Sequence, residues 1–249
     1  MVDNSDKMVN DLWAQLHSDI VMHLDSNTNI ENFLQWPSIK STMHSAGCNR
    51  VQYEALLNNN WDKWKVALKE DSFGNPTLST FYPATSYASI YHAYSLSQLK
   101  PTGDVSDIKS IFEFGGGYGS MCKLIHRLGF NGTYTIYDLP GLLRLQEIYL
   151  SKVGVKTDKI TLTDTLPTID VDLFIAEWSV GESPIELRHK VFENIKFKEC
   201  IISFNSLFGN FKNLEYFDEL AKSMPNYEWK LQPIEHLPHN YYLTARSKK

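Results

Sequence analysis

From residue 110 onward the chain alternates between short apolar strands and amphipathic helices, and this alternation narrows its possible folds more than any other feature. Seven strands are predicted, at Ser110–Phe114, Thr133–Tyr137, Lys159–Leu162, Asp172–Ala176, Glu199–Phe204, Tyr227–Gln232 and Tyr241–Ala245. Helices are predicted between them at Ser120–Leu128, Gly141–Lys152, Pro184–Asn194 and Asn213–Ser223. Strands and helices joined by short connections favour a mostly parallel, doubly wound α/β sheet of the Rossmann-like kind.

The last two predicted strands break this alternation. Only the segment LPHN, residues 237–240, and its flanking residues separate them, which is too short for a crossover helix. We therefore expect these two strands to connect without a helix and to pair antiparallel.

The first hundred residues follow a helical pattern instead. Apolar residues recur at three- and four-residue steps from Met8 to Ile20, and further helices are predicted over residues 51–68 and 85–99. The last of these helices carries His92 and a stripe of tyrosines that either packs in the core or lines an acceptor pocket: Tyr87, Tyr91 and Tyr94. We divide the chain into a helical region over the substrate side, residues 1–100, and a catalytic domain, residues 101–249.

Charge and composition exclude several classes of partner. The chain has 249 residues, a net charge of −5 and no block of Lys or Arg, so neither nucleic acid nor an anionic membrane surface is an expected partner. No apolar run approaches the ~20 residues that span a bilayer, and the start of the chain is too polar for a signal peptide. Three cysteines without paired spacing indicate reduced thiols, so a cytoplasmic location is expected.

A glycine-rich turn follows the first predicted strand, in the segment EFGGGYGS. Unpaired backbone N–H groups at the start of the next helix favour an anionic part of a ligand, and glycines permit close approach. The spacing is E-x-G-x-G-x-G, with Glu113, Gly115, Gly117 and Gly119. A dinucleotide fingerprint would need Gly or Ala where Ser120 stands. An acid before the loop suits the ammonium and sulfonium of S-adenosyl-L-methionine, whereas it would repel a pyrophosphate.

Acids at the ends of the next two strands extend this interpretation. Asp138 follows the second strand, where a carboxylate can accept hydrogen bonds from ribose hydroxyls. Asp164 follows the third strand, where an acid can accept from the adenine amino group. Tyr118 in the loop and Leu139 after Asp138 complete the predicted cofactor contacts on this side.

Three segments resemble the sugar O-methyltransferases, which are adenosylmethionine-dependent enzymes of glycan assembly: IFEFGGGYGSMCKLI (111–125), YDLPGLLRLQEIYLSK (137–152) and DLFIAEWSVGESP (172–184). The likeness covers roughly residues 110–245, and Gly74-Asn75-Pro76 is similar to a G-N-P that precedes the domain in that family. It departs at Glu177, where a small or amide residue is usual, and at Gly181, where Ser is usual. The resemblance implies a seven-stranded class I methyltransferase sheet with a reversed last strand. It also implies a carbohydrate acceptor. A homodimer is compatible with it, as is a chain that is linked to glycosyltransferases or acts together with them.

The acceptor is expected over the fourth strand and the loop after it, because the cofactor would occupy the first three strands. Glu182 matches an acidic position of the family and is a candidate general base, as is His239 on the last connection. Glu177 and Trp178 are candidate cofactor contacts, through the amine and the adenine ring respectively. His236 and His239 have metal-ligand spacing but lack further ligands, so no metal is predicted.

Two other functions remain open from the sequence. A nicotinamide-dependent oxidoreductase can use a similar sheet, although it would need a place for a pyrophosphate. A non-catalytic interaction module could retain the same fold and the cofactor site without transferring a methyl group.

Overall fold

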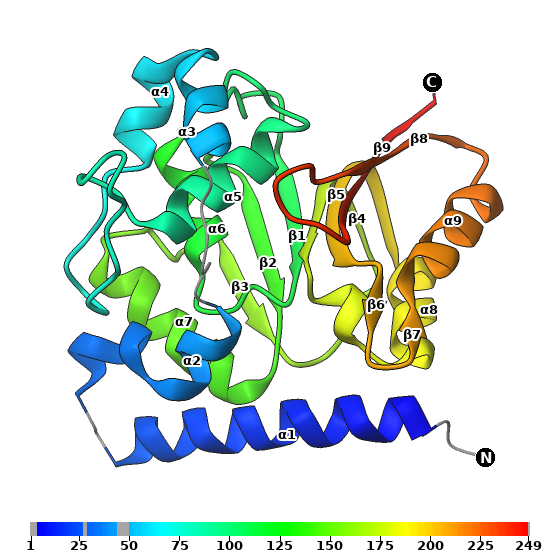
Figure 1. Ribbon diagram of the computed structural model, residues 1–249, viewed down its shortest axis with the longest axis horizontal. Coiled ribbons are helices and arrows are strands. Elements are labelled where there is room, and N and C mark those ends of the chain that lie inside the picture. Colours follow the sequence, from blue (N-terminus) through cyan, green and yellow to red (C-terminus); the bar gives the residue numbers. More distant parts are fainter. Residues whose placement is uncertain (1–3, 27–28, 44–49, 249) are drawn as a thin grey trace.

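A twisted seven-stranded sheet with helices on both faces forms the body of the protein, as Figure 1 shows. The computed structural model describes residues 4–26, 29–43 and 50–248. The sheet contains β1 (Ser110–Phe114), β2 (Thr133–Tyr137), β3 (Ile160–Thr163), β4 (Ile169–Glu177), β5 (Ile195–Asn205), β8 (Tyr227–Pro233) and β9 (Asn240–Ser247). The predicted Rossmann-like fold class is confirmed.

The strand order is β3-β2-β1-β4-β5-β9-β8. Strands β1 to β5 pair parallel, whereas β9 runs antiparallel to both of its neighbours, β5 and β8. The predicted reversal of the last strand is therefore confirmed. Because β9 is reversed, its first residue, Asn240, pairs with Asn205 at the end of β5. The start of β9 thus reaches the edge of the sheet where the parallel strands end.

Helices cover the two faces unequally. The segments outside the main sheet are α1 (Asn4–Asp25), η1 (Ile30–Gln35), α2 (Pro37–Thr42), α3 (Arg50–Leu57), α4 (Trp61–Ala67), α5 (Tyr87–Ser97), α6 (Ser120–Arg127), α7 (Pro140–Lys152), η2 (Val180–Glu182), α8 (Ile185–Asn194), the hairpin β6 (Leu207–Phe208) with β7 (Phe211–Lys212), and α9 (Asn213–Ser223). In Figure 1 α8 and α9 lie at one side of the sheet, α5 to α7 lie at the other, and α1 lies below.

Alternation along the strands explains this layering, because successive side chains point to opposite faces. Ile111 of β1 belongs to a buried cluster with residues of α5, α6 and α7, whereas its neighbour Phe112 belongs to a second cluster with α8 and α9. Strand β4 divides in the same way, with Ile175 on the first face and Phe174 on the second. The sheet is therefore buried on both faces, as a parallel sheet requires.

The helical region shares its core with the sheet. Ile90, Ala93 and Leu96 of α5 are fully buried in the same cluster as Ile111. Residues on both sides of residue 100 therefore share one buried core.

Several details of the helical region differ from the sequence-based expectation. The helix predicted over residues 51–68 is interrupted at Asn60, whose φ of 55° is left-handed, so it forms α3 and α4. The short elements η1 and α2 and the β6–β7 hairpin were not predicted, because segments this short carry little periodicity. Gly74 has a φ of 90°, and a Cβ there would lie 2.5 Å from the Phe33 ring, so the turn at Gly74 packs tightly against η1.

Cys122 and Cys200 are buried free thiols, in agreement with the expected reduced state, and Cys48 lies outside the described residues. Within the described parts of the chain, no helix combines the length and apolar character needed to cross a membrane.

A buried ion pair joins the helical region to the helix after the glycine loop. The Lys123 ammonium of α6 contacts the Glu70 carboxylate, and their side chains are only 2% and 6% exposed. Glu70 also accepts hydrogen bonds from Ser86 and from Ser89, the latter at 2.7 Å. Burial alone would raise the pKa of Glu70, but Lys123 and these hydroxyl groups outweigh it and lower that pKa. The carboxylate is therefore charged and fully partnered.

Replacing Lys123 by Met is expected to destabilise the protein by about 3–5 kcal/mol, because it leaves the Glu70 carboxylate buried without its cation. The double variant Glu70→Gln/Lys123→Met should recover much of this loss. Urea unfolding followed by circular dichroism measures both changes. Lys190→Met, which removes an exposed pair with Glu186, is the control and should leave the unfolding midpoint unchanged. A Lys123→Met protein as stable as the parent would contradict this account.

Candidate functional site

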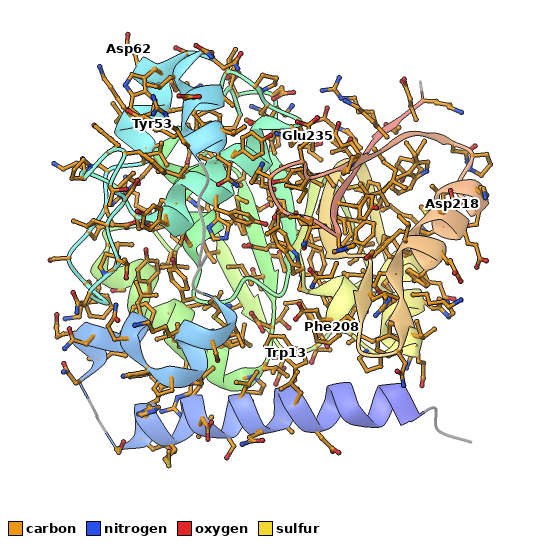
Figure 2. All side chains as sticks on the ribbon, in the orientation of Figure 1. Trp13, Tyr53, Asp62, Phe208, Asp218 and Glu235 are labelled. Carbon is orange, nitrogen blue, oxygen red and sulfur yellow. The ribbon has the colours of Figure 1, made fainter. Side chains whose placement is uncertain are left out.

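A cavity of about 660 Å³ opens at the carboxyl ends of the parallel strands. Its wall is built from the glycine loop after β1, the segments after β2, β3 and β4, the start of α8, and the connection into β9. Helices α1, α2 and α5 close other sides, and Trp13 of α1 points toward the body of the protein in Figure 2. Ligands of open α/β sheets bind in this position, at the point where the strand order changes direction.

The glycine loop has the left-handed backbone that the sequence predicted, but packing between loops, as well as approach of a ligand, explains its glycines. Gly115, Gly117 and Gly119 all have positive φ, at 71°, 60° and 94°. A Cβ at Gly115 would lie 2.3 Å from the Cβ of Ser179, in the loop after β4. The Ser179 hydroxyl also donates to the Phe114 carbonyl. Gly115 is therefore required by the packing of two loops, and not only by approach of a ligand.

Glu113 ends β1 at the cavity wall and is only 3% exposed. It accepts a hydrogen bond from the Tyr134 hydroxyl at 2.8 Å. Among the described residues no cationic side chain pairs with it. Burial raises the pKa of Glu113 to about 8, against the lowering effect of Tyr134. A positively charged group of a ligand would stabilise the ionised form of such a buried carboxylate.

Asp138 directly follows β2, lines the same wall and is 8% exposed. Its Oδ2 accepts from the Gly117 N–H at 3.0 Å and from Gln146 Nε2 at 2.9 Å, and its Oδ1 accepts from the Leu139 N–H at 2.8 Å. Burial raises the pKa of Asp138 to about 7, although these hydrogen bonds oppose the rise. Two carboxylate oxygens offer about four lone pairs, so one remains, on Oδ1, for a ribose hydroxyl.

The other residues predicted on the cofactor side also line the cavity, with different exposures. Tyr118 is buried, and its ring packs edge-on against Phe33 and Tyr149. Leu139 lies at the wall beside Asp138. Asp164 lies at the rim and is exposed, as its position after the edge strand β3 dictates.

Glu177 and Trp178 follow β4 and contribute in different ways. The Glu177 carboxylate is buried and accepts from the hydroxyls of Ser95 and Ser203, at 2.5 and 2.6 Å. Burial nevertheless raises the pKa of Glu177 to about 7. Trp178 has a φ of 61°, which is unusual for a bulky residue and typical of functional sites. Its Nε1 donates to Asn240 Oδ1 at 2.7 Å, and its ring centroid lies 4.9 Å from that of Tyr91.

Glu182 lies at the cavity wall in η2, directly before α8. Burial raises the pKa of Glu182 to about 7, and the nearby Arg188 guanidinium only partly opposes this rise. Within the described residues its carboxylate makes neither a hydrogen bond nor a salt bridge, so the group is available to a ligand. A carboxylate with a pKa near neutrality can accept a proton during a reaction.

The three candidate histidines are placed very differently. His239 is exposed, has a φ of 64° and does not line the cavity, although the next residue, Asn240, does. His236 packs against the Tyr94 ring at 5.5 Å and also lies off the cavity wall. His92 lines the cavity with Tyr91, and its Nδ1 lies 3.1 Å from Ser120 Oγ. Burial lowers the pKa of His92 to about 4, so its ring is neutral at pH 7.

Some wall residues were not singled out from the sequence. Trp13, Ser179, Asn205 and Asn240 reach the cavity from segments distant in the chain. Trp13 belongs to the apolar pattern that predicted a helix, but that pattern does not indicate what the helix covers. The position of Asn240 depends on the register of the reversed strand, which the sequence alone does not supply.

The residues at the wall fit adenosylmethionine better than a dinucleotide. Glu113 and Asp138 flank the glycine loop, and a pyrophosphate there would meet two carboxylates and no cation. An ammonium or sulfonium would instead offset the buried charge. No group of three or more His, Cys, Asp or Glu side chains in the described ranges is arranged to hold a metal ion.

No known protein family matches this sequence, and no curated protein matches it. Solved structures do resemble its fold. A protein from Methanococcus maripaludis assigned as an S-adenosyl-L-methionine-dependent methyltransferase is 11% identical, with a TM-score of 0.50 over 65% of this chain and 87% of that one. A precorrin-6y C5,15-methyltransferase from Geobacter metallireducens is 15% identical, with a TM-score of 0.48 over 74% and 98%.

A methyltransferase from Podospora anserina, solved with adenosylhomocysteine, is 13% identical, with a TM-score of 0.47 over 80% of this chain and 94% of that one. Identities this low establish the fold and not the acceptor. The strand order, with one reversed strand between β5 and β8, is that of the class I methyltransferase fold, and this chain has that fold.

Proposed function

We propose that this protein is an S-adenosyl-L-methionine-dependent O-methyltransferase that acts on a sugar hydroxyl. The observation that carries the proposal is Glu113, a buried carboxylate without a cation, beside a left-handed glycine loop. Both lie at the carboxyl edge of a sheet with the class I methyltransferase order. The resemblance of residues 110–245 to sugar O-methyltransferases supports the choice of a carbohydrate.

Different residues of the chain would bind different groups of the cofactor. Glu113 would accept the ammonium, and Asp138 would accept one ribose hydroxyl through the remaining lone pair of Oδ1. Gln146 and the N–H groups of Gly117 and Leu139 hold the Asp138 carboxylate in position. Adenosylmethionine supplies a methyl group on a positively charged sulfur, which becomes neutral when that carbon–sulfur bond breaks.

The acceptor side must align a hydroxyl, remove its proton and exclude water. Glu182 is the residue that we assign to the proton, because it borders the cavity, accepts no hydrogen bond from a described residue and has a pKa of about 7. Trp178 and Tyr91 provide an aromatic wall nearby, and Trp13 of α1 also lines the cavity. His92 is neutral and next to this wall, so it can orient a hydroxyl by a hydrogen bond.

The two alternatives have less support. A nicotinamide-dependent oxidoreductase would place a pyrophosphate against Glu113 and Asp138, where like charges repel it. A non-catalytic module would have no need for a buried, unpartnered acid at the acceptor wall. Protection from thermal unfolding by NAD but not by adenosylhomocysteine would favour the first. Cofactor binding without methyl transfer to any sugar would favour the second.

Asp138→Ala is expected to weaken adenosylhomocysteine binding by about tenfold to a hundredfold or more, because it removes a charged acceptor and frees the Gly117 N–H. Isothermal titration calorimetry measures the change. Asp164→Ala is the matched control on the same wall, and it should weaken binding much less because Asp164 is exposed. Equal losses in the two variants would contradict the role of Asp138.

Adenosylmethionine affinity is expected to rise between pH 6 and pH 8. The pKa of Glu113 is about 8 and that of Asp138 about 7 in the free protein, and a cationic ligand binds their ionised forms. For each carboxyl group that must lose its proton for binding, the affinity rises by up to about tenfold per pH unit below the pKa of that group. Calorimetry in buffers of different ionisation enthalpy should detect proton release on binding at pH 7.

Glu113→Gln should lower the affinity and flatten this pH dependence, whereas the control Asp164→Asn should preserve it. An affinity that falls as the pH rises from 6 to 8, or a slope unchanged in Glu113→Gln, would argue against the assignment.

Glu182→Gln is expected to lower methyl transfer by about a hundredfold to ten-thousandfold, because the amide cannot take the proton. The affinity for adenosylhomocysteine should stay the same. In the parent protein the rate should rise with pH up to about 7, where Glu182 becomes ionised. The matched control is Glu186→Gln, one turn away and exposed. Undiminished turnover in Glu182→Gln would exclude it as the base.

A further inference from the structure

The cavity is lined by acids without any matching cation. Glu113, Asp138, Glu177 and Glu182 have side chains at its wall, and Asp164 lies at its rim. Among the lining residues that the structure describes, none is Lys or Arg. The cationic cofactor of the proposed function would offset the acids near the glycine loop. Glu177 and Glu182, on the acceptor side, would remain.

The nearest guanidinium, that of Arg188, offsets the charge of Glu182 only in part. Arg188 is fully buried behind η2, where it donates to the carbonyls of Ser183 and Gly181 and to Asn213 Oδ1. Its guanidinium also lies over the Phe211 ring, 4.6 Å from the centroid. Through these contacts Arg188 stabilises the loop before α8, and its side chain does not line the cavity.

The start of α8 offers no anion site either. Helix N-termini attract phosphate through free N–H groups and the helix dipole. Here Glu182 precedes the helix and Glu186 occupies its first turn. Pro184, at the N-cap, has no N–H to offer. The Glu182 carboxylate lines the cavity and opposes any phosphate that approaches this end, whereas Glu186 is exposed and paired with Lys190 outside the wall.

The same wall suits an uncharged ring. Trp178 is held by Asn240 and by the Tyr91 ring, so it presents a fixed aromatic surface at the cavity. Asn205 adds an amide at the end of β5, paired in register with Asn240. The C–H face of a sugar can pack on such a ring, while amides and carboxylates accept or donate to its hydroxyls.

We infer that the acceptor is a phosphate-free sugar, free or already in a glycosidic bond, and that sugar phosphates and nucleoside-diphosphate sugars are rejected. This inference rests on the proposed function and narrows it. The acceptor oxygen forms the bond to the methyl carbon as the carbon–sulfur bond breaks, and the hydroxyl proton passes to Glu182. In a reaction sequence, this methylation comes before a sugar is activated by phosphate or after a glycosyl transfer has removed the phosphate.

Matched acceptor pairs test the inference with the full-length protein and adenosylmethionine. The probes are the methyl glycosides of glucose, galactose, mannose and rhamnose, set against the 1-phosphate and a nucleoside-diphosphate form of each sugar. Adenosylhomocysteine release and product mass measure turnover. We expect kcat/KM to be at least about tenfold higher for the phosphate-free member, because each like-charge contact in a partly buried site opposes binding by about that factor or more. A higher kcat/KM for a phosphorylated member would overturn the inference and leave the proposed function intact.

A binding measurement tests whether the cavity accepts a phosphate group, independently of methyl transfer. In the adenosylhomocysteine complex of the parent protein, uridine diphosphate and pyrophosphate should give no heat of binding at millimolar concentration. Saturable binding that a methyl glycoside displaces would overturn the inference. Glu182→Gln should weaken the discrimination against phosphate by about tenfold, whereas Glu186→Gln should not. If no sugar of either kind is methylated while adenosylhomocysteine still binds, the carbohydrate assignment fails and this inference fails with it.

Discussion

The contact between Ser179 and the bare Cα of Gly115 is the constraint on which the rest of the site depends. It brings the loop after β4 against the loop after β1, so the proposed cofactor wall and the proposed acceptor wall share one support. The left-handed backbone at Gly115 and the strained backbone at Trp178 both belong to this junction. A side chain at position 115 would separate the walls before any ligand arrived.

Around that junction the protein keeps carboxylates in a place where burial disfavours their charge. Each of Glu113, Asp138, Glu177 and Glu182 has a raised pKa because water is largely excluded. Asp138 and Glu177 are held by neutral donors, whereas Glu113 has one such donor and Glu182 has none. Burial makes the charged form of each of these carboxylates unfavourable, and a bound cation or a transferred proton would relieve that cost.

The sequence predicted the fold well, and it placed Glu113 and Asp138 at one edge of the sheet, because both features are encoded locally. Strand periodicity located β1 and β2 to the residue, and the acids Glu113 and Asp138 follow from their positions at strand ends. The acceptor wall was harder, because tertiary packing assembles it. His239 and Asn240 both precede the last strand as predicted from the sequence, and only the observed register shows that Asn240, rather than His239, lines the cavity. Likewise, the amphipathic pattern around Trp13 predicts a helix but not the surface that it covers.

The reversal of β9 has a consequence for how such a protein can diversify. Because this strand runs against its neighbours, the tip of the β8–β9 hairpin arrives at the edge where the parallel strands finish, and it contributes Leu237 and Asn240 to the wall. A hairpin tip tolerates insertions and substitutions without shifting the strands that carry it. If the proposed function holds, recognition of new acceptors can evolve in this one connection while the glycine-loop half of the molecule stays unchanged.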